Sequence, residues 1–179
     1  MTFFKKAAMR QSFLSIVFLF LYLCSFSQTD VYNQNIMDPK ADQEILIGYC
    51  TRDGLMSSPF SSYLKEGYAQ YKPDVKVIKE IQPKIKGVTM TIIMGTWCSD
   101  SQEQVPKFFK ILDKIHFSKK NIQLICVDSD KKAGDVDLVN YNIQKVPTFI
   151  VYKKGREIGR IVETPYASLE KDLLMFFND

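Results

Sequence analysis

The chain has 179 residues, of which 46% are hydrophobic, and this is enough for one domain with a buried core. Its formal charge is +4, from 24 basic and 20 acidic side chains, but three of the basic ones lie in residues 1–27, which carry no acid. Without that segment, 21 basic side chains face 20 acidic ones and the charge falls to +1. No basic run with interleaved aromatic residues remains, so the composition argues against nucleic-acid binding.

Residues 1–27 have the pattern of an export signal. Basic residues precede the apolar run 13–24, and small residues follow it, which is typical of a removable signal peptide. The run is shorter than the roughly 20 apolar residues of a membrane span. We therefore expect cleavage and a periplasmic or secreted protein, with no stable membrane span afterwards. An uncleaved anchor is one alternative. A lipoprotein attached through Cys24 is another, although Leu23 stands where a small residue is expected.

Residues 28–72 precede the most informative motif and divide into two parts. Residues 28–44 are polar and predict a linker. Residues 45–72 predict an N-terminal helical extension, in which the apolar run 45–50 fits either a strand or a helix. Ser-Pro at 58–59 then begins a helix with aromatic residues at helical spacing. This extension is most simply an extra layer on the core, and a partner-docking face is the alternative.

Residues 73–179 predict alternating helices and strands. A helical pattern begins after Pro73, and the β-rich run 88–94 is apolar throughout, as in a strand buried on both faces. The remaining expected elements are a helix after Cys98, a strand at 121–127, a short helix at 135–141, strands at 148–152 and 157–162 joined by a glycine turn, and a helix at 168–177.

The motif Trp97-Cys98-Ser99-Asp100-Ser101 lies where the strand at 88–94 meets the following helix. A cysteine at a helix N-terminus is near unpaired N–H groups and roughly +0.5 of a charge, which favour the nucleophilic thiolate. Ser101 would lie one turn into the helix, where its hydroxyl could donate a hydrogen bond to the sulfur. Asp100 would oppose the thiolate if it turned toward Cys98. Ser101 also occupies the place where a C-x-x-C motif carries its second thiol.

The element order and several residues resemble the thioredoxin family. Trp97-Cys98 matches the family's tryptophan–cysteine pair, Pro106 matches the proline that kinks its active-site helix, and Gly155 fits its hairpin. The resemblance covers residues 73–178. It implies an α/β, thioredoxin-like three-layer fold, with a central mixed sheet of about four to five strands flanked by helices.

The stretch 141–148 is similar to the one that leads to the family's cis-proline. The resemblance therefore implies a cis bond between Val146 and Pro147, opposite Cys98. Backbone polar groups there would pair with an extended peptide or with glutathione, and Trp97 would shield the sulfur.

Three departures separate this chain from an ordinary dithiol reductase of that family. Ser101 replaces the second thiol, Ile92 stands where many thioredoxins carry a buried acid, and Leu124 stands where a lysine often partners that acid. Thiol–disulfide exchange passes through a mixed disulfide that a second thiol must resolve. Glutathione, a partner protein or Cys50 of this chain would have to supply it. The alternative for Cys50 is a plain structural cysteine.

The resemblance thus implies monothiol thiol–disulfide exchange through Cys98, with protein or low-molecular-weight thiols and disulfides as partners. The alternative is a redox-inactive binding module of the same fold, in which Cys98 is an apolar filler under Trp97. Peroxide chemistry is a third interpretation, and it would need an activating base or arginine near Cys98.

The remaining reactive side chains are expected to be structural. Cys126 lies in an apolar strand, where a free cysteine behaves as a small hydrophobe. His116 is expected on the surface, and Asp128 and Asp130 are expected to form a turn rather than a metal site. We expect neither a cofactor nor a metal.

Overall fold

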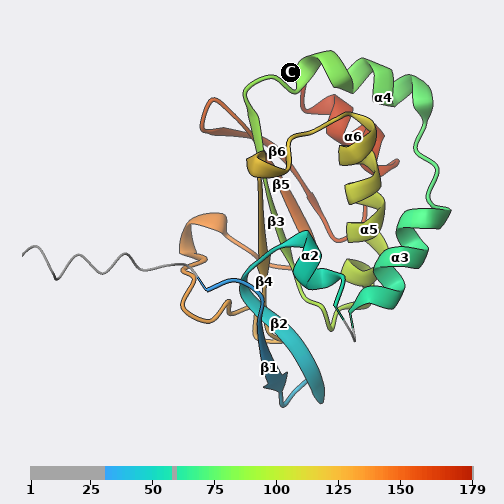
Figure 1. Ribbon diagram of the computed structural model, residues 1–179. Helices are drawn as coiled ribbons and strands as arrows, with labels where there is room; N and C mark the ends of the chain where they lie inside the picture. Colours follow the sequence, from blue (N-terminus) through green and yellow to red (C-terminus); the bar gives the residue numbers. More distant parts are fainter. Residues whose placement is uncertain (1–30, 58–59, 179) are drawn as a thin grey trace, which may run out of the picture. The chain divides into compact units, whose positions relative to one another are not determined.

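A six-stranded sheet organises residues 31–57 and 60–178, which are the residues that the computed structural model describes (Figure 1). The strands lie in the order β1-β2-β4-β3-β5-β6, and β3 and β4 are parallel while every other neighbouring pair is antiparallel. The expected α/β fold with a mixed sheet is confirmed, with slightly more strands than expected. The strands are β1 Gln34–Asp38, β2 Gln43–Cys50, β3 Val88–Met94, β4 Ile122–Cys126, β5 Thr148–Lys153 and β6 Arg156–Val162.

Helices cover one face of this sheet, and α3 and α5 run side by side on it (Figure 1). The helices are α2 Arg52–Leu55, α3 Ser61–Gln70, α4 Val75–Ile81, α5 Ser99–Lys114 and α6 Leu169–Met175, with short 3-10 turns η1 Gln82–Lys84, η2 Lys119–Asn121 and η3 Val139–Tyr141. Within the described ranges, no helix is both long and apolar enough to span a membrane. The predicted signal peptide at 1–27 and the predicted helix start at 58–59 lie outside the described residues.

The opposite face of the sheet is covered by the segment that connects β4 to β5, drawn in orange in Figure 1. The short helix expected at 135–141 is reduced to the 3-10 turn η3. The Asp137 carboxylate accepts a hydrogen bond from the Val139 N–H at 2.9 Å, and Asn142 adopts a left-handed conformation with φ of 49°. Local side-chain bonding of this kind competes with a regular helix.

The core on the helix face is built around α5, whose apolar side chains recur at helical spacing as predicted. Phe108 is fully buried and lies against Phe149 of β5, with ring centroids 4.3 Å apart. Gly67 lets α3 approach this helix closely, since a Cβ there would come within 3.1 Å of Pro106. The other buried residues of α5 are Ser101, Gln104, Val105, Pro106, Phe109, Ile111 and Leu112.

The N-terminal region differs from the expected linker and helical extension. Residues 34–38 form β1, and β2 begins at Gln43, inside the segment expected to be a linker. β1 pairs with β2 in the register Gln34↔Ile47, and β2 continues the sheet against β4. Most of β1 is exposed because it is an edge strand, so its polar sequence lacks the apolar alternation that usually marks a strand. Helix α3 lies where a helix was expected, and α2 is a further short helix before it.

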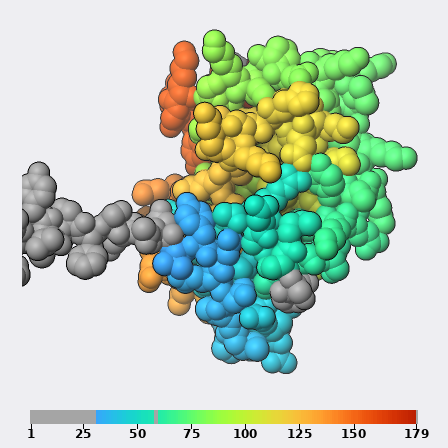
Figure 2. All heavy atoms as spheres, in the orientation of Figure 1, coloured from blue at the N-terminus to red at the C-terminus, as the bar shows by residue number. Residues whose placement is uncertain are grey.

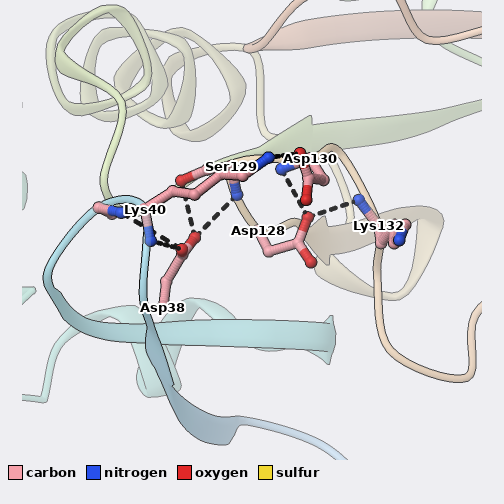
Figure 3. A network of polar contacts seen from close by, with 7 residues as sticks. Asp38, Lys40, Asp128, Ser129, Asp130 and Lys132 are labelled. Carbon is pink, nitrogen blue, oxygen red and sulfur yellow. Dashed lines mark hydrogen bonds and ion pairs between the residues drawn. The ribbon is translucent and has the colours of Figure 1, made fainter.

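The buried Asp38 carboxylate anchors the β1–β2 turn to the loop after β4 (Figure 3). One oxygen accepts the N–H groups of Lys40 and Ala41, at 2.9 and 3.2 Å, and the other accepts the Ser129 N–H at 2.8 Å and hydroxyl at 2.7 Å. Lys40 forms an ion pair with Asp130 across the same contact. Backbone N–H groups of two segments that are far apart in the sequence therefore share one hydrogen-bond acceptor, the Asp38 carboxylate.

The loop after β4 also closes on itself in this network. The Asp128 carboxylate accepts the N–H groups of Asp130 and Lys132, at 2.9 and 2.8 Å, which gives Asp128 the turn-forming role expected from the sequence (Figure 3).

We predict that Asp38→Asn lowers the free energy of unfolding near neutral pH. This stability gap between the variant and the wild type should close in acid. The hydrogen bond from the Ser129 hydroxyl is the largest influence and, against desolvation and with the backbone N–H groups, it lowers the pKa of Asp38 to about 2. The unfolded value is about 3.9, so the contribution is complete above that pH and is lost as the pH falls toward about 2. Urea-unfolding midpoints at several pH values measure the gap.

The exposed Asp135, changed to Asn in the same way, is the matched control and should show little gap at any pH. A gap for Asp38→Asn that is the same at neutral and acid pH would contradict the proposed role of the ionised carboxylate.

Candidate active site at the end of strand β3

Cys98 lies at the junction of β3 and α5, where the sequence predicted it. It is the N-cap residue of α5, with an extended backbone (φ −84°, ψ 125°), and its carbonyl accepts the Gln102 N–H at 2.9 Å. Its own N–H donates to the Gly95 carbonyl at 3.1 Å, which closes the turn from the strand into the helix. The side chain is half-buried, so the sulfur is shielded but accessible.

The sulfur of Cys98 faces the segment before β5. The Cys98 thiol donates a hydrogen bond to the Val146 carbonyl at 3.4 Å, and the Val146–Pro147 peptide bond is cis. The Pro147 carbonyl is already occupied, because it accepts the Glu163 N–H at 2.7 Å. The structure therefore brings together Cys98, Val146 and Pro147 as the resemblance implied.

Trp97 lies beside Cys98, and its ring is held by a hydrogen bond to the residue that follows β4. Its indole Nε1 donates to the Val127 carbonyl at 2.9 Å, and its ring folds back over Gly95. A Cβ at Gly95 would come within 2.5 Å of Nε1, so a glycine is needed there. The next residue, Thr96, is buried and accepts the Leu46 N–H of β2 at 3.2 Å. The turn is thus tied to two neighbouring strands.

Ser101 stands below Cys98 and is completely buried. Its hydroxyl accepts the Gly95 N–H at 3.3 Å, so it stabilises the turn that carries Cys98. In the part of the chain that the structure describes, no hydrogen bond joins this hydroxyl to the Cys98 sulfur. The donor role expected for Ser101 is therefore absent from this arrangement. Ser99 is exposed and Asp100 is half-buried in the first turn of α5.

The three departures from the thioredoxin pattern lie where the resemblance placed them. Ile92 and Leu124 are direct neighbours across the β3–β4 pair, and Ile92 is also opposite Phe149 of β5. The side chains of Ile92, Leu124 and Phe149 are buried in the core under α5. Packed hydrocarbon therefore fills the positions where an acid and its lysine partner would handle protons in the family.

A cavity next to the site was not predicted from the sequence. It has a volume of about 420 Å³ and lies between α3 and α5, where Tyr63 and Gly67 face Ser99 and Gln102. Its walls come from two helices that are far apart in the sequence, so a local pattern could not reveal it. The Tyr63 hydroxyl is buried and, within the described residues, has no hydrogen-bond partner.

Cys50 does not lie next to Cys98. It is buried in the helix-side core together with Cys126, whereas Cys98 packs against the apolar cluster on the other face of the sheet. This placement does not support a direct resolving role for Cys50 at Cys98. Cys126 is fully buried, and His116 is exposed beyond the end of α5.

Comparison with known proteins assigns the chain to a family. The thioredoxin family model matches residues 70–174. This match covers more than half of the 179 residues, and the chain therefore belongs to the thioredoxin family.

The curated relatives are similar over part of the chain. A chloroplastic thioredoxin Y of Oryza sativa subsp. japonica is 27% identical over 81 residues, which are 45% of this chain and 45% of that protein. The thioredoxin of Echinococcus granulosus is 29% identical over 93 residues, or 51% of this chain and 81% of the relative. The match thus spans less than half of the rice protein.

Solved thioredoxin structures also match part of the chain. The reduced thioredoxin pre-protein of Schistosoma mansoni is 27% identical, with 60% of this chain and 94% of that one covered at a TM-score of 0.35. The thioredoxin of Fasciola hepatica is 21% identical, with 47% and 75% covered at a TM-score of 0.33.

Proposed function

We propose that this thioredoxin-family protein performs thiol–disulfide exchange with Cys98 as a single reactive thiol. The observation that carries the proposal is the position of that sulfur. It is half-buried at the N-terminus of α5 and 3.4 Å from the Val146 carbonyl, with buried Ser101 in the place of a second thiol. Unpaired N–H groups at the start of a helix favour the thiolate.

The reaction begins with attack of the Cys98 thiolate on a disulfide sulfur of the partner. A new S–S bond forms to Cys98, the partner's S–S bond breaks, and the second partner sulfur leaves as a thiolate. Ser101 has no sulfur with which to attack this mixed disulfide. A thiol from outside the site therefore attacks the partner's sulfur, forms a new disulfide with it and releases the Cys98 thiolate.

Recognition of the partner would use the surface around Cys98. An extended peptide, or the peptide part of a low-molecular-weight thiol, would lie along the segment before β5, close to Val146 and Pro147. The cavity between α3 and α5 borders the same site through Ser99 and offers room for a side chain of the partner. This supports protein or low-molecular-weight thiols and disulfides as substrates.

A binding module without redox activity is the second candidate. One observation favours it, because the Cys98 thiol already has an acceptor in the Val146 carbonyl and is partly covered. A protonated, hydrogen-bonded thiol of this kind would serve as a filler. The reactivity of Cys98 in the folded protein distinguishes the two functions.

We predict that oxidised glutathione forms one adduct with the folded protein that lacks residues 1–27 and that this adduct depends on Cys98. Cys98→Ala should reduce the rate of adduct formation by roughly tenfold or more, since Cys50 and Cys126 are buried away from a molecule as large as oxidised glutathione. Intact-mass spectrometry over time measures the reaction. Cys50→Ala is the matched control and should retain the adduct. A protein that reacts at Cys98 after unfolding but not before would be a binding module.

We further predict that Ser101→Cys converts the site into a dithiol. The introduced thiol would lie one turn below Cys98, and the mixed disulfide should then resolve within the molecule, because the introduced thiol can form a disulfide with Cys98. Glutathione adducts should become transient, and turnover with a disulfide substrate should rise by roughly tenfold or more. Peptide mapping and insulin reduction provide the measurements.

Ser99→Cys is the control for that experiment, because its side chain is exposed and adjacent to Cys98 rather than one turn below it. A stable glutathione adduct in Ser101→Cys, with no disulfide between Cys98 and the introduced thiol, would show that position 101 cannot reach the sulfur and would overturn the proposed geometry.

We also propose that the protein acts after export, with residues 1–27 as a removable signal. The support is the charged and apolar pattern of that segment. When the full chain is expressed in a bacterial host, the product should appear outside the cytoplasm with an N-terminus near residue 28. A cytoplasmic product that still begins at Met1 would refute the proposal.

A further inference from the structure

A second pair of thiols lies away from Cys98. Cys50 ends β2 and Cys126 ends β4, and the register Gly48↔Cys126 and Cys50↔Leu124 makes the two cysteines diagonal neighbours on one face of the sheet. Both side chains are buried, with exposed fractions of 4% and 0%. The function proposed for Cys98 uses neither of them.

The two thiols influence each other's ionisation. The Cys50 thiol donates a hydrogen bond to the Gly48 carbonyl at 3.5 Å. Interaction with the Cys126 thiol is the largest influence on Cys50 and lowers its pKa, while the same interaction and complete burial raise the pKa of Cys126. Within this pair, the negative charge therefore favours Cys50.

Cys50 also borders a cavity of about 230 Å³, whereas Cys126 lies behind it and does not line the cavity. The walls bring the chain around Tyr32 and Arg52 against Phe109 of α5 and Lys119 of η2. Figure 2 views this face, where residues in blue and teal meet the yellow end of α5. The space suits a small molecule, and the burial of Cys50 keeps a protein disulfide away.

The charges around the cavity are mixed. Arg52 and Lys119 line it, and so do Asp53 and Asp113. The Arg52 guanidinium is held by Asp113 at 2.9 Å and lies over the rings of Tyr68 and Phe109. A small neutral reactant is therefore a better fit than a charged one.

We propose that Cys50 and Cys126 form a second redox site, at which a small hydroperoxide enters the cavity and oxidises Cys50 and Cys126 then closes a disulfide with it. This inference does not depend on any activity of Cys98. It identifies Cys50 as the sulfur that is oxidised first, because it borders the cavity. Cys126 is then the resolving thiol, because it is the diagonal neighbour of Cys50 on the same face of the sheet.

The two steps balance with hydrogen peroxide as the oxidant. In the first, the Cys50 sulfur attacks one peroxide oxygen, an S–O bond forms, the O–O bond breaks, and the second oxygen leaves as water with the thiol proton. In the second, the Cys126 sulfur attacks the Cys50 sulfenic acid, an S–S bond forms, and the hydroxyl leaves as water with the Cys126 proton. Two thiols lose two electrons, and one peroxide becomes two water molecules.

The disulfide should be easily reduced. Diagonal neighbours in antiparallel strands are usually about 7–8 Å apart, which is longer than the span of about 5.5–6 Å between the Cα atoms of a relaxed disulfide. The ends of β2 and β4 must therefore shift when the bond forms, and strained disulfides are the more labile ones.

The test treats the full chain carrying Cys98→Ala with hydrogen peroxide, in the folded state, and maps the products by mass spectrometry. We expect a peptide pair linked through Cys50 and Cys126, which a mild dithiol reductant separates again. Adding Cys126→Ser should instead leave a sulfenic acid on Cys50 that dimedone traps. Adding Cys50→Ser should slow the oxidation of Cys126 by roughly tenfold or more, because the interior thiol lacks access to the cavity.

Access is tested separately with Ile122→Phe, which narrows the cavity without changing either thiol. It should slow formation of the linked peptide by roughly tenfold, and circular dichroism verifies that the variant is folded. The inference is overturned if the pair stays reduced in the folded Cys98→Ala protein and oxidises after unfolding in urea. It is also overturned if Cys126 is oxidised as fast without Cys50 as with it.

Discussion

β3 is paired with β4 on one side and with β5 on the other, and its side chains are buried on both faces. A chain that leaves such a strand can turn only beyond its last residue, Met94, and must then return over one face as α5. That constraint concentrates the site in four residues. Gly95 closes the turn and Trp97 covers it. Cys98 is the N-cap residue of α5, and the Ser101 hydroxyl bonds the Gly95 N–H. The sulfur is accessible because the turn that carries it lies beyond the paired part of β3.

The same sheet separates Cys98 from the other two described thiols. Cys98 contacts the apolar cluster on the face covered by the β4–β5 connection, whereas Cys50 and Cys126 lie in the core on the helix face. Passage from one group to the other would require a break in the sheet. A mechanism in which Cys50 resolves a mixed disulfide on Cys98 therefore conflicts with the packing. Monothiol exchange at one face and a separate thiol pair at the other are compatible with it.

Helix α5 and strands β3, β5 and β6 could be predicted because their apolar residues recur with the period of the element that they form. Trp97, Cys98 and Pro147 were equally accessible from the sequence, since each occupies a fixed place in a known pattern. β1 was missed because an edge strand does not need a buried face, and its pairing with β2 is determined by backbone groups and by the distant Asp38–Ser129 contact. The helix expected at 135–141 failed because Asp137 bonds its own backbone.

By itself, the sequence determined the family fold, the place of Cys98 at the start of a helix, and the lack of a second thiol three residues later. Each of these follows from residue types at short spacing, because apolar periodicity determines which face of an element is buried and helix geometry determines which residues are one turn apart. Tertiary structure alone decided that the Ser101 hydroxyl bonds the turn instead of the sulfur, that Cys50 and Cys126 are diagonal neighbours in one core, and that a cavity reaches Cys50. Each of these depends on which segments, distant in the chain, are neighbours across the sheet, and no local pattern encodes that.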